Sequence, residues 1–427
     1  GAWHLLRTDR LSDSADGTGP PVESPIRTVV MPFSYDTTAR PHPFMTTGLV
    51  EELIANLAAL PGVEVVALGS AAQAADDELA PEEIARVLDV DYVIRGSVRQ
   101  ERDRVRVGVS AIETSGSLVR LSKVYEGLTE NILDLQAEVA VDIADALAVT
   151  VTPAVESRLE AAGMRDPEAL ALYYQAATLR DPPSDPVRSQ LAEAAYRRVI
   201  ELDPGFAGGY AGLAYVLATR AWWGLSEQPD TDAQNALNAA RTAVEKDPEF
   251  GWSHMSLGIA LNVVGDHDGS LRAARRAVAL APNDPYVLAF SALLQAYAGE
   301  LEAGPSLARS AIRLDPLSAR TPYRNIAGLT LFHSGRFEEA LEVLLENVRV
   351  GGPDGPHMAY YRAATYARLG RVEDGRRELE RASSFPYEFH LRAFLSAFRD
   401  PREADKLFES LATLGFDPEE ASASRTP

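Results

Sequence analysis

The sequence contains no cysteine among its 427 residues. Disulfide bonds, iron–sulfur clusters and zinc sites with thiolate ligands are therefore excluded. Histidine is scarce as well, and no two of the seven histidines have the spacing of metal ligands on one helix face. We therefore expect neither a metal ion nor another cofactor. The histidines are His4, His42, His254, His267, His333, His357 and His390.

Basic residues are in deficit. The chain has 41 lysines and arginines against 62 acidic residues, which gives a formal net charge of −21 and an isoelectric point near 4.8. A surface of this charge repels nucleic acid and anionic lipid. We therefore expect no nucleic-acid partner.

Long apolar runs are also missing, since no stretch reaches the roughly 18 apolar residues that a membrane span needs. The first seven residues place Trp3 beside two leucines and before Arg7, a pattern typical of a spanning helix that ends at a membrane interface. The alternative is a frayed terminus. Residues 8–25 are polar and rich in glycine, proline and serine, as in a linker. We assign residues 1–25 to a membrane-proximal stub and linker.

Residues 26–152 alternate between strand and helix patterns and predict an α/β domain. The expected order is strand, helix, strand, helix, three strands and a helix, so that one sheet mixes parallel and antiparallel pairs. The expected strands are 26–33, 63–68, 91–99, 105–114 and 118–125, and the expected helices are 44–60, 81–88 and 129–149.

Residues 165–427 show no strand pattern but an internal repeat. The helix-terminating dipeptides Asp-Pro and Ala-Pro recur, with their prolines at Pro204, Pro248, Pro282 and Pro316, which are 44, 34 and 34 residues apart. A 34-residue repeat is the tetratricopeptide period. The ten additional residues of the first interval are assigned to an insertion between Thr219 and Asp232.

Small residues recur within these units where two helices of a hairpin would cross, as at Gly258 and Gly328, and glycines such as Gly265 and Gly335 end the first helix. The pattern predicts an all-α solenoid of about six helical hairpins, followed by a terminal helix pair at 389–414. We place the boundary with the α/β domain between residues 150 and 168.

The repeat region resembles the tetratricopeptide superfamily, whose antiparallel helix pairs stack into a right-handed superhelix with an inner groove that binds peptides or protein surfaces. The first domain resembles the TolB-like amino-terminal domain of bacterial regulators, through Val29–Phe33, Gly48–Leu53 and Asp91–Arg99. The tandem is similar to the C-terminal half of bacterial membrane-anchored Ser/Thr kinases, nucleotide cyclases and winged-helix regulators.

In those proteins a cytoplasmic effector precedes one membrane span, and the tandem follows the span. The resemblance therefore implies membrane association, with the bulk of this chain on the periplasmic rather than the cytoplasmic side. No segment of the sequence matches a kinase glycine-rich loop, catalytic loop or metal-binding Asp motif. The effector is therefore expected to be absent from this sequence.

Catalytic constellations are not apparent. Glu51 and Glu52 are neighbours in a predicted helix and do not face each other, so we interpret them as a solvated helix face. The glycine-rich loop at 351–355 follows no strand and lacks a lysine, unlike a phosphate-binding loop. Asp266, His267 and Asp268 occupy a hairpin turn, where exposed polar residues are usual. We expect no enzymatic activity and no small-molecule substrate.

Four arginines fall on two neighbouring predicted strands and could form a basic patch that contacts an acidic partner or an anion. The alternative is a solvated face on which they pair with acidic neighbours. The arginines are Arg95, Arg99, Arg104 and Arg106, and the neighbours are Glu101, Asp103 and Glu113.

The inner groove carries the candidate partner-binding residues, because the first helix of each hairpin lines it in this superfamily. The side chains expected there are mostly aromatic or apolar, which predicts a groove for an apolar or aromatic segment, including a helical one. They are Trp252, Met255, Asn262, Tyr286, Phe290, Tyr297, Asn325, Phe332, Tyr360, Tyr361 and Arg368, and Trp222 and Trp223 in the insertion form a separate candidate anchor.

The alternative is that these rings fill the core between repeats. If they line a groove, few of Trp252, Tyr286, Phe290, Phe332 and Tyr360 should be buried in the isolated chain.

Together these observations predict a non-catalytic protein-interaction scaffold, an extramembrane accessory or assembly subunit that docks on a partner protein, a peptide or a membrane complex. The alternative is the ligand- or peptide-sensing half of a membrane-anchored signalling protein.

Overall fold

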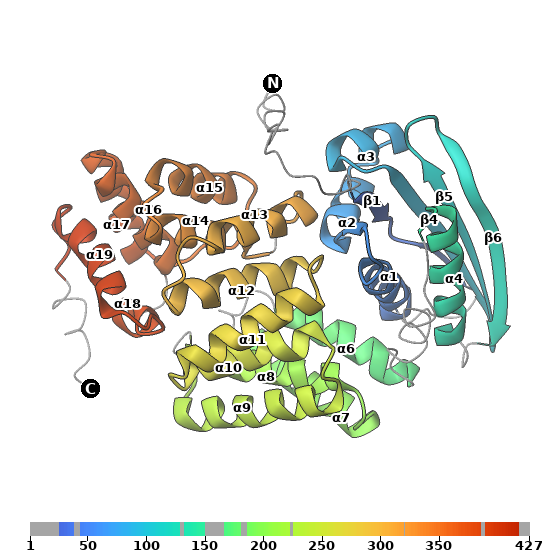
Figure 1. The fold of residues 1–427 in the computed structure, drawn as a ribbon, viewed down its shortest axis with the longest axis horizontal. Coiled ribbons are helices and arrows are strands. Elements are labelled where there is room, and N and C mark those ends of the chain that lie inside the picture. Colours follow the sequence, from blue (N-terminus) through green and yellow to red (C-terminus); the bar gives the residue numbers. More distant parts are fainter. Residues whose placement is uncertain are drawn as a thin grey trace, which may run out of the picture.

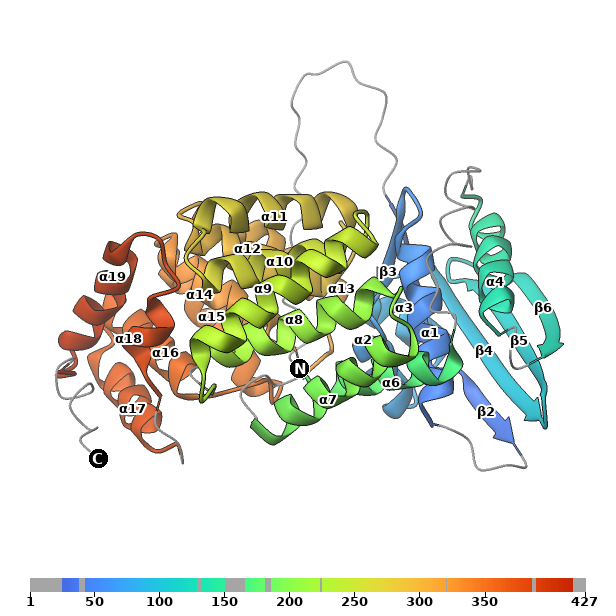
Figure 2. The same cartoon turned by 90° about the horizontal axis from the view of Figure 1, so that it is seen from below.

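The structure is a computed structural model that describes residues 25–37, 43–128, 132–149, 166–180, 186–222, 225–319, 321–385 and 389–417. An α/β part made from the described residues between 25 and 149 lies at one end of the molecule, and helices α17–α19 lie at the other end (Figure 1). Figure 2 shows the remaining helices between these two ends.

The α/β part is built around one mixed β-sheet. Its strands follow the order β3-β1-β4-β5-β6, with β3, β1 and β4 parallel and β4, β5 and β6 antiparallel, while β2 pairs with the far half of β4. The sheet confirms the predicted mixture of parallel and antiparallel pairs. The strands are β1 Ile26–Val30, β2 Ser34–Thr37, β3 Val63–Val66, β4 Tyr92–Glu101, β5 Arg104–Glu113 and β6 Leu118–Leu128.

Helices cover both faces of this sheet (Figure 1). Val30 and Ile94 belong to the core that α1 and α4 cover, whereas their neighbours Val29 and Val93 point into the core under α2 and α3. This alternation is the period of two that strands impose. The helices are α1 Pro43–Ala58, α2 Leu68–Asp76, α3 Pro81–Leu88 and α4 Ile132–Ala146.

Strand β2 and helix α2 were not predicted from the sequence. Strand β2 has only four residues and polar side chains at Ser34 and Asp36, too short a segment to show a period. Helix α2 buries small residues, Ser70, Ala71 and Ala74, which carry a weak hydrophobic pattern.

The rest of the described chain is helical, and consecutive helices pair into six hairpins that confirm a tetratricopeptide-type solenoid. From the third hairpin on, the first helices begin at residues 251, 285, 323 and 356, close to the 34-residue period. The pairs are α6 Pro167–Leu179 with α7 Pro186–Leu202, α8 Ala207–Trp222 with α9 Pro229–Lys246, α10 Gly251–Val263 with α11 His267–Leu280, α12 Pro285–Tyr297 with α13 Gly304–Leu314, α14 Tyr323–His333 with α15 Phe337–Arg349, and α16 Pro356–Arg368 with α17 Val372–Ser383. Helices α18 Leu391–Leu395 and α19 Pro401–Ala412 follow.

The predicted insertion in the second hairpin lies largely in longer helices. Helices α8 and α9 have 16 and 18 residues, against 13 and 14 for α10 and α11. Gly258 confirms the predicted close crossing of α10 and α11. A Cβ atom on Gly258 would lie 3.3 Å from the backbone oxygen of Ser270 and 2.8 Å from Cδ1 of Leu294 in α12, so any side chain there would force its neighbours to move.

The second helix of each hairpin is the outer one. Helix α11 buries one stripe that includes Ala273, Ala274 and Ala277 and leaves its other face exposed. By contrast, every residue of α14 and every residue of α12 after Pro285 is buried. The inner helices are therefore covered on the groove side as well as on the side of the outer helices.

The α/β part packs against the solenoid through polar contacts. The backbone N–H of Ala67 donates to the carbonyl oxygen of Leu314 at 2.9 Å, and the side chain of Asn283 donates to the carbonyl oxygen of Val63 at 2.8 Å. The Asp315 carboxylate accepts hydrogen bonds from the N–H and the hydroxyl of Ser70 at 3.0 and 2.6 Å. Burial raises the pKa of Asp315 to about 6.

Across the described residues, no helix combines the length and the apolar character that crossing a bilayer requires. The stub at 1–7, on which the expected membrane association depends, lies outside the described residues, as does most of the expected domain boundary at 150–168.

Candidate binding site

The inner surface of the solenoid carries an aromatic cluster made of Tyr215, Trp252, Tyr286 and Phe290. Tyr286 stacks on Phe290 and on Trp252, with ring centroids 5.1 Å apart in both pairs. Tyr215 of α8 meets Phe290 edge-on at 5.4 Å, although Phe290 belongs to α12, two hairpins further along. The superhelix is therefore curved tightly enough for its own inner helices to meet across the groove.

Arg180, the C-cap of α6, lies over this aromatic cluster. Its guanidinium carbon is 4.2 Å from the ring centroid of Trp252 and 4.6 Å from that of Tyr286, the arrangement of a cation–π contact. The indole N–H of Trp252 donates to the carboxylate of Asp284 at 2.8 Å. Asp284 also caps the N-terminus of α12 by accepting from the backbone N–H groups of Tyr286 and Val287.

Glu51 and Glu52 reach the same junction from α1. Burial raises the pKa of Glu51 to about 7, and Arg180 opposes this shift. Burial also raises the pKa of Glu52 to about 6, against the hydrogen bond that the Tyr174 hydroxyl donates to it at 2.9 Å. The interpretation of these residues as a solvated helix face is therefore wrong, because α1 packs against α6 at this junction.

At the other end of the inner helices, a segment of the chain itself packs across their C-terminal ends. We call residues 389–400 the C-terminal strap. Five of its apolar side chains are buried, and the ring of Phe398 lies 4.6 Å from the Tyr297 ring and 4.3 Å from the His333 ring, centroid to centroid. The buried side chains are Leu391, Phe394, Leu395, Ala397 and Phe398.

Two hydrogen bonds join the backbone of the strap to the inner helices. The N–H of Arg399 donates to the carbonyl oxygen of Tyr297 at 2.8 Å. The side-chain amide of Asn262 donates to the carbonyl oxygen of Ala397 at 3.2 Å. The strap thus contacts the C-terminal ends of α10, α12 and α14, which belong to three successive hairpins.

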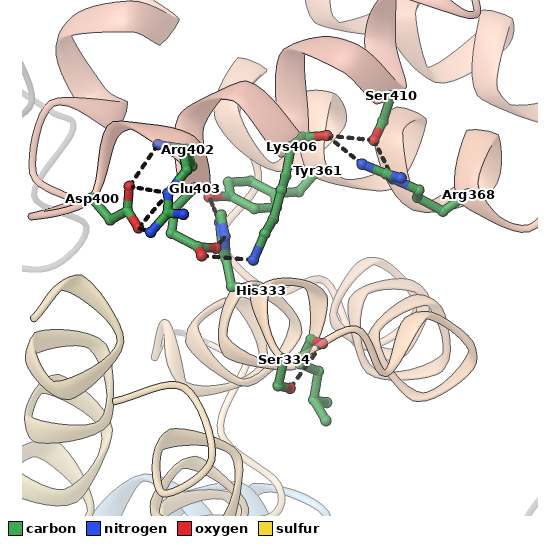
Figure 3. A network of polar contacts seen from close by, with 10 residues as sticks. His333, Ser334, Tyr361, Arg368, Asp400, Arg402, Glu403, Lys406 and Ser410 are labelled. Carbon is green, nitrogen blue, oxygen red and sulfur yellow. Dashed lines mark hydrogen bonds and ion pairs between the residues drawn. The ribbon is translucent and has the colours of Figure 1, made fainter. Parts of the chain in front are cut away.

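A polar network fixes α19 next to the strap (Figure 3). His333 of α14 is 2.8 Å from the Tyr361 hydroxyl through Nε2 and 2.9 Å from the Glu403 carboxylate through Nδ1. Lys406 donates to the other oxygen of Glu403 at 2.6 Å. Burial lowers the pKa of His333, although Glu403 opposes the shift. Arg368 of α16 extends the network by donating to the Ser410 hydroxyl.

Most of the predicted groove residues are buried. Buried side chains are those of Met255, Asn262, Tyr286, Phe290, Tyr297, Asn325, Phe332, Tyr360 and Tyr361, whereas Trp222 and Trp252 are partly exposed and Arg368 is exposed. Trp223 lies outside the described residues.

This burial corrects the expectation that few of these rings would be covered in the isolated chain. The cause is the tight curvature of the superhelix together with Arg180 and the strap, and the burial is what the core alternative predicts. Partner binding through these residues remains a prediction.

The sequence reasoning missed Arg180 and Asp284 entirely. Arg180 follows an ordinary helix, and Asp284 stands in a turn where Asp-Pro is common. The strap did leave a signal, because Leu391, Phe394, Leu395 and Phe398 have helical i, i+3, i+4, i+7 spacing. That signal was assigned to a terminal helix pair and said nothing about the surface it covers.

The arginines of β4 and β5 behave largely as a solvated face. Arg99 lies directly opposite Arg106 in the β4–β5 pair. Arg106 forms an ion pair with Glu126 of β6 at 3.4 Å, with more than half of both side chains exposed, and such exposed pairs contribute little. Glu113, one of the expected partners, instead contacts Arg120.

No family model matches the chain, and comparison with known proteins finds a partial relative. The putative adenylate cyclase 3 of Rhizobium meliloti strain 1021 is 31% identical over 269 residues. The match covers 61% of this chain and 45% of the relative, so the chain spans less than half the length of that protein.

Solved structures show weaker likeness. The tetratricopeptide protein YrrB, described as having an unusual peptide-binding site, matches 52% of this chain and 98% of its own at 15% identity and a TM-score of 0.33. TolB from Acinetobacter baumannii matches 29% of this chain and 28% of its own at 15% identity and a TM-score of 0.23. Likenesses at these scores carry no argument, and the fold assignment rests on the helix pairs themselves.

Proposed function

We propose that this chain is a non-catalytic protein-interaction scaffold whose solenoid binds a polypeptide segment of a partner along its inner surface. One observation carries the proposal: the inner surface already holds a polypeptide segment, the C-terminal strap. The strap is bound by buried rings and by backbone hydrogen bonds to Tyr297 and Asn262. These are the contacts through which a helical groove recognises an apolar peptide.

The carboxylates of the junction support a structural rather than a catalytic role. Asp284 is used as a helix cap and as the acceptor for Trp252, and Glu52 accepts from Tyr174. Within the described ranges, no group of three or more His, Asp or Glu side chains is placed to hold a metal ion. The finer assignment, an accessory subunit that docks on a membrane complex, depends on residues 1–7 and remains a prediction.

A site-specific photo-cross-linker tests the scaffold function. Benzoylphenylalanine would replace Trp252, which is partly exposed on the inner helix α10, in cells of the organism that encodes the chain. The matched control places it at Leu191, which is 52% exposed on the outer helix α7. We expect a single protein adduct from position 252 and none from position 191. No adduct from position 252, or the same adducts from both positions, would contradict the proposal.

The second candidate function is the regulatory half of a larger signalling protein. The specific observation is the 31% identity to a protein named as a putative adenylate cyclase, of which the match covers 45%. The test is the coding sequence on either side of this chain. An effector domain in the same reading frame supports the regulatory function, whereas a stop codon and a separate start on both sides would leave the scaffold function alone.

A further inference from the structure

The strap covers a strip of the inner surface where polar groups are left unpaired. We call Trp222, Asn262, Tyr297 and His333 the strap site. Trp222 meets Tyr297 edge-on at 5.1 Å, and Tyr297 in turn meets Phe398 of the strap at 4.6 Å. The indole N–H of Trp222, the hydroxyl of Tyr297 and Oδ1 of Asn262 are buried without a hydrogen-bond partner among the described residues.

These unpaired atoms show that the strap does not complement the strip fully. A buried donor or acceptor without a partner costs free energy, because it has given up its bonds to water. Two of the atoms are donors and the third is an acceptor. A segment with the same apolar side chains and an added hydrogen-bonding group would therefore bind this strip more tightly than the strap does.

The strap also lacks a stable structure of its own. Helix α18 has only five residues, far fewer than an isolated helix needs in water. The ion pair of Arg399 in the strap with Asp268 of α11, at 2.7 Å, has both side chains more than half exposed and is correspondingly weak. The strap is therefore held mainly by its five buried apolar side chains, by the two hydrogen bonds to Tyr297 and Asn262 and by its covalent attachment.

Helix α19 does not depend on the strap for its position. Glu403, Lys406 and Ser410 connect it to His333 and Arg368, and α19 packs along α16. The strap can therefore leave the strip while α19 remains bound.

We propose that the strap site is a peptide-binding site and that the strap is its intramolecular occupant. This inference rests on the proposed scaffold function. The partner segment is a short helix with apolar side chains at i, i+3, i+4 and i+7, the spacing of Leu391, Phe394, Leu395 and Phe398. It carries an aromatic ring at the position of Phe398 and a hydrogen-bond acceptor within reach of the Tyr297 hydroxyl and the Trp222 indole. It binds by displacing the strap.

Competition with the strap sets the affinity. A short covalent connection gives the strap an effective concentration in the millimolar range. A free peptide of the same sequence must therefore bind the wild-type chain weakly, and any change that loosens the strap must strengthen the binding of that peptide.

The test uses the full chain and a fluorescent peptide with the sequence Phe389–Asp400. Fluorescence anisotropy would compare the wild-type chain with the Phe398→Ala chain, whose strap has lost its central ring. We expect the Phe398→Ala chain to bind the peptide at least about tenfold more tightly than the wild type, since a buried aromatic anchor dominates such a contact. A control peptide that itself carries Phe398→Ala should bind neither chain measurably.

Equal affinity of the two chains for the peptide, with circular dichroism showing both folded, would overturn the inference. If Phe398→Ala prevents folding, the exposed substitution Arg399→Glu replaces it, because a second negative charge beside Asp268 loosens the strap without touching the core. Tighter peptide binding by Arg399→Glu supports the inference. Unchanged binding, with the amide of Arg399 exchanging hydrogen as slowly as those of α14, overturns it.

The two proposals fail separately. Cross-linking from Trp252 reports a partner that reaches the aromatic cluster, whereas the peptide assay reports only the strap site. Persistent cross-linking with a negative peptide assay would place the partner elsewhere on the inner surface and leave the scaffold function standing.

Discussion

Replacement of Phe290 decides whether the aromatic cluster is core or binding surface. The ring is 5% exposed, stacks on Tyr286 at 5.1 Å and meets Tyr215 edge-on at 5.4 Å. Phe290→Ala removes a buried ring and leaves a cavity between α8 and α12. Truncations of this kind cost about 3–5 kcal/mol. We expect a loss of that size in the free energy of unfolding, because the inner helices have no room to close over the cavity.

Urea denaturation followed by circular dichroism measures this loss. Phe290→Leu is the matched control, since it keeps most of the volume and should cost less than about 1.5 kcal/mol. The reasoning fails if Phe290→Ala unfolds at the same urea concentration as the wild type. In that case the ring contributes little to the core, and the original groove interpretation of Phe290 regains its support.

Three further predictions concern packing, an unpaired hydroxyl and pH. Gly258→Leu should lower the free energy of unfolding by about 1–3 kcal/mol, since its Cβ alone would lie 2.8 Å from Leu294. The control Gly116→Leu, with no atom within 4 Å of its Cβ, should change the stability little. Equal melting temperatures of the two variants would contradict the close crossing of α10 and α11. Tyr297→Phe should raise the stability by about 1 kcal/mol because it removes an unpaired buried hydroxyl. Tyr361→Phe should lower the stability because it removes the hydrogen bond to His333. Urea midpoints that move in the same direction for both variants would contradict these expectations. The folded state holds the Glu51 proton more tightly than the unfolded state, with a pKa of about 7 against 4.5, so the free energy of unfolding falls as pH rises through this window. Glu51→Gln should therefore stabilise the chain at pH 8, by about 1 kcal/mol for this half-buried side chain, and much less at pH 5. An equal effect of Glu51→Gln on the free energy of unfolding at both pH values would contradict the burial of the charge.

Sequence reasoning predicted the hairpins because their signals are local. The glycines that end inner helices adopt positive φ, for example 82° at Gly265 and 78° at Gly335, and only glycine does so without strain. Gly258 and Gly328 stand where a Cβ would collide with the neighbouring helix. A positive φ or a close helix crossing each requires glycine at one position, so a single residue is enough to predict it. The β4–β5 hairpin was predicted for the same reason, from alternation and a short polar turn.

The covering of the inner surface could not be predicted in this way, because it depends on the curvature of the whole superhelix. The small rotation between successive hairpins accumulates over α8, α10 and α12, and it decides whether Tyr286 contacts Tyr215 or stays open to a partner. No single residue in the sequence indicates the size of this rotation. The same holds for Arg180 and Glu51, which meet only because α6 and α1 dock at one end of the solenoid.

An aromatic residue on an inner helix is equally consistent with core and groove as long as this curvature is unknown. Buried polar atoms without a partner also occur elsewhere in the described solenoid, but Trp222, Asn262 and Tyr297 are informative because all three lie next to the strap. A core position is rarely filled by a group whose hydrogen bonds it cannot satisfy, whereas a binding surface needs such groups to select its ligand. The strip under the strap therefore differs from the aromatic cluster around Phe290, where Trp252 donates to Asp284 and the hydroxyls of Tyr215 and Tyr286 contact each other. The first has the chemistry of a binding surface with a replaceable cover, and the second has the chemistry of a core.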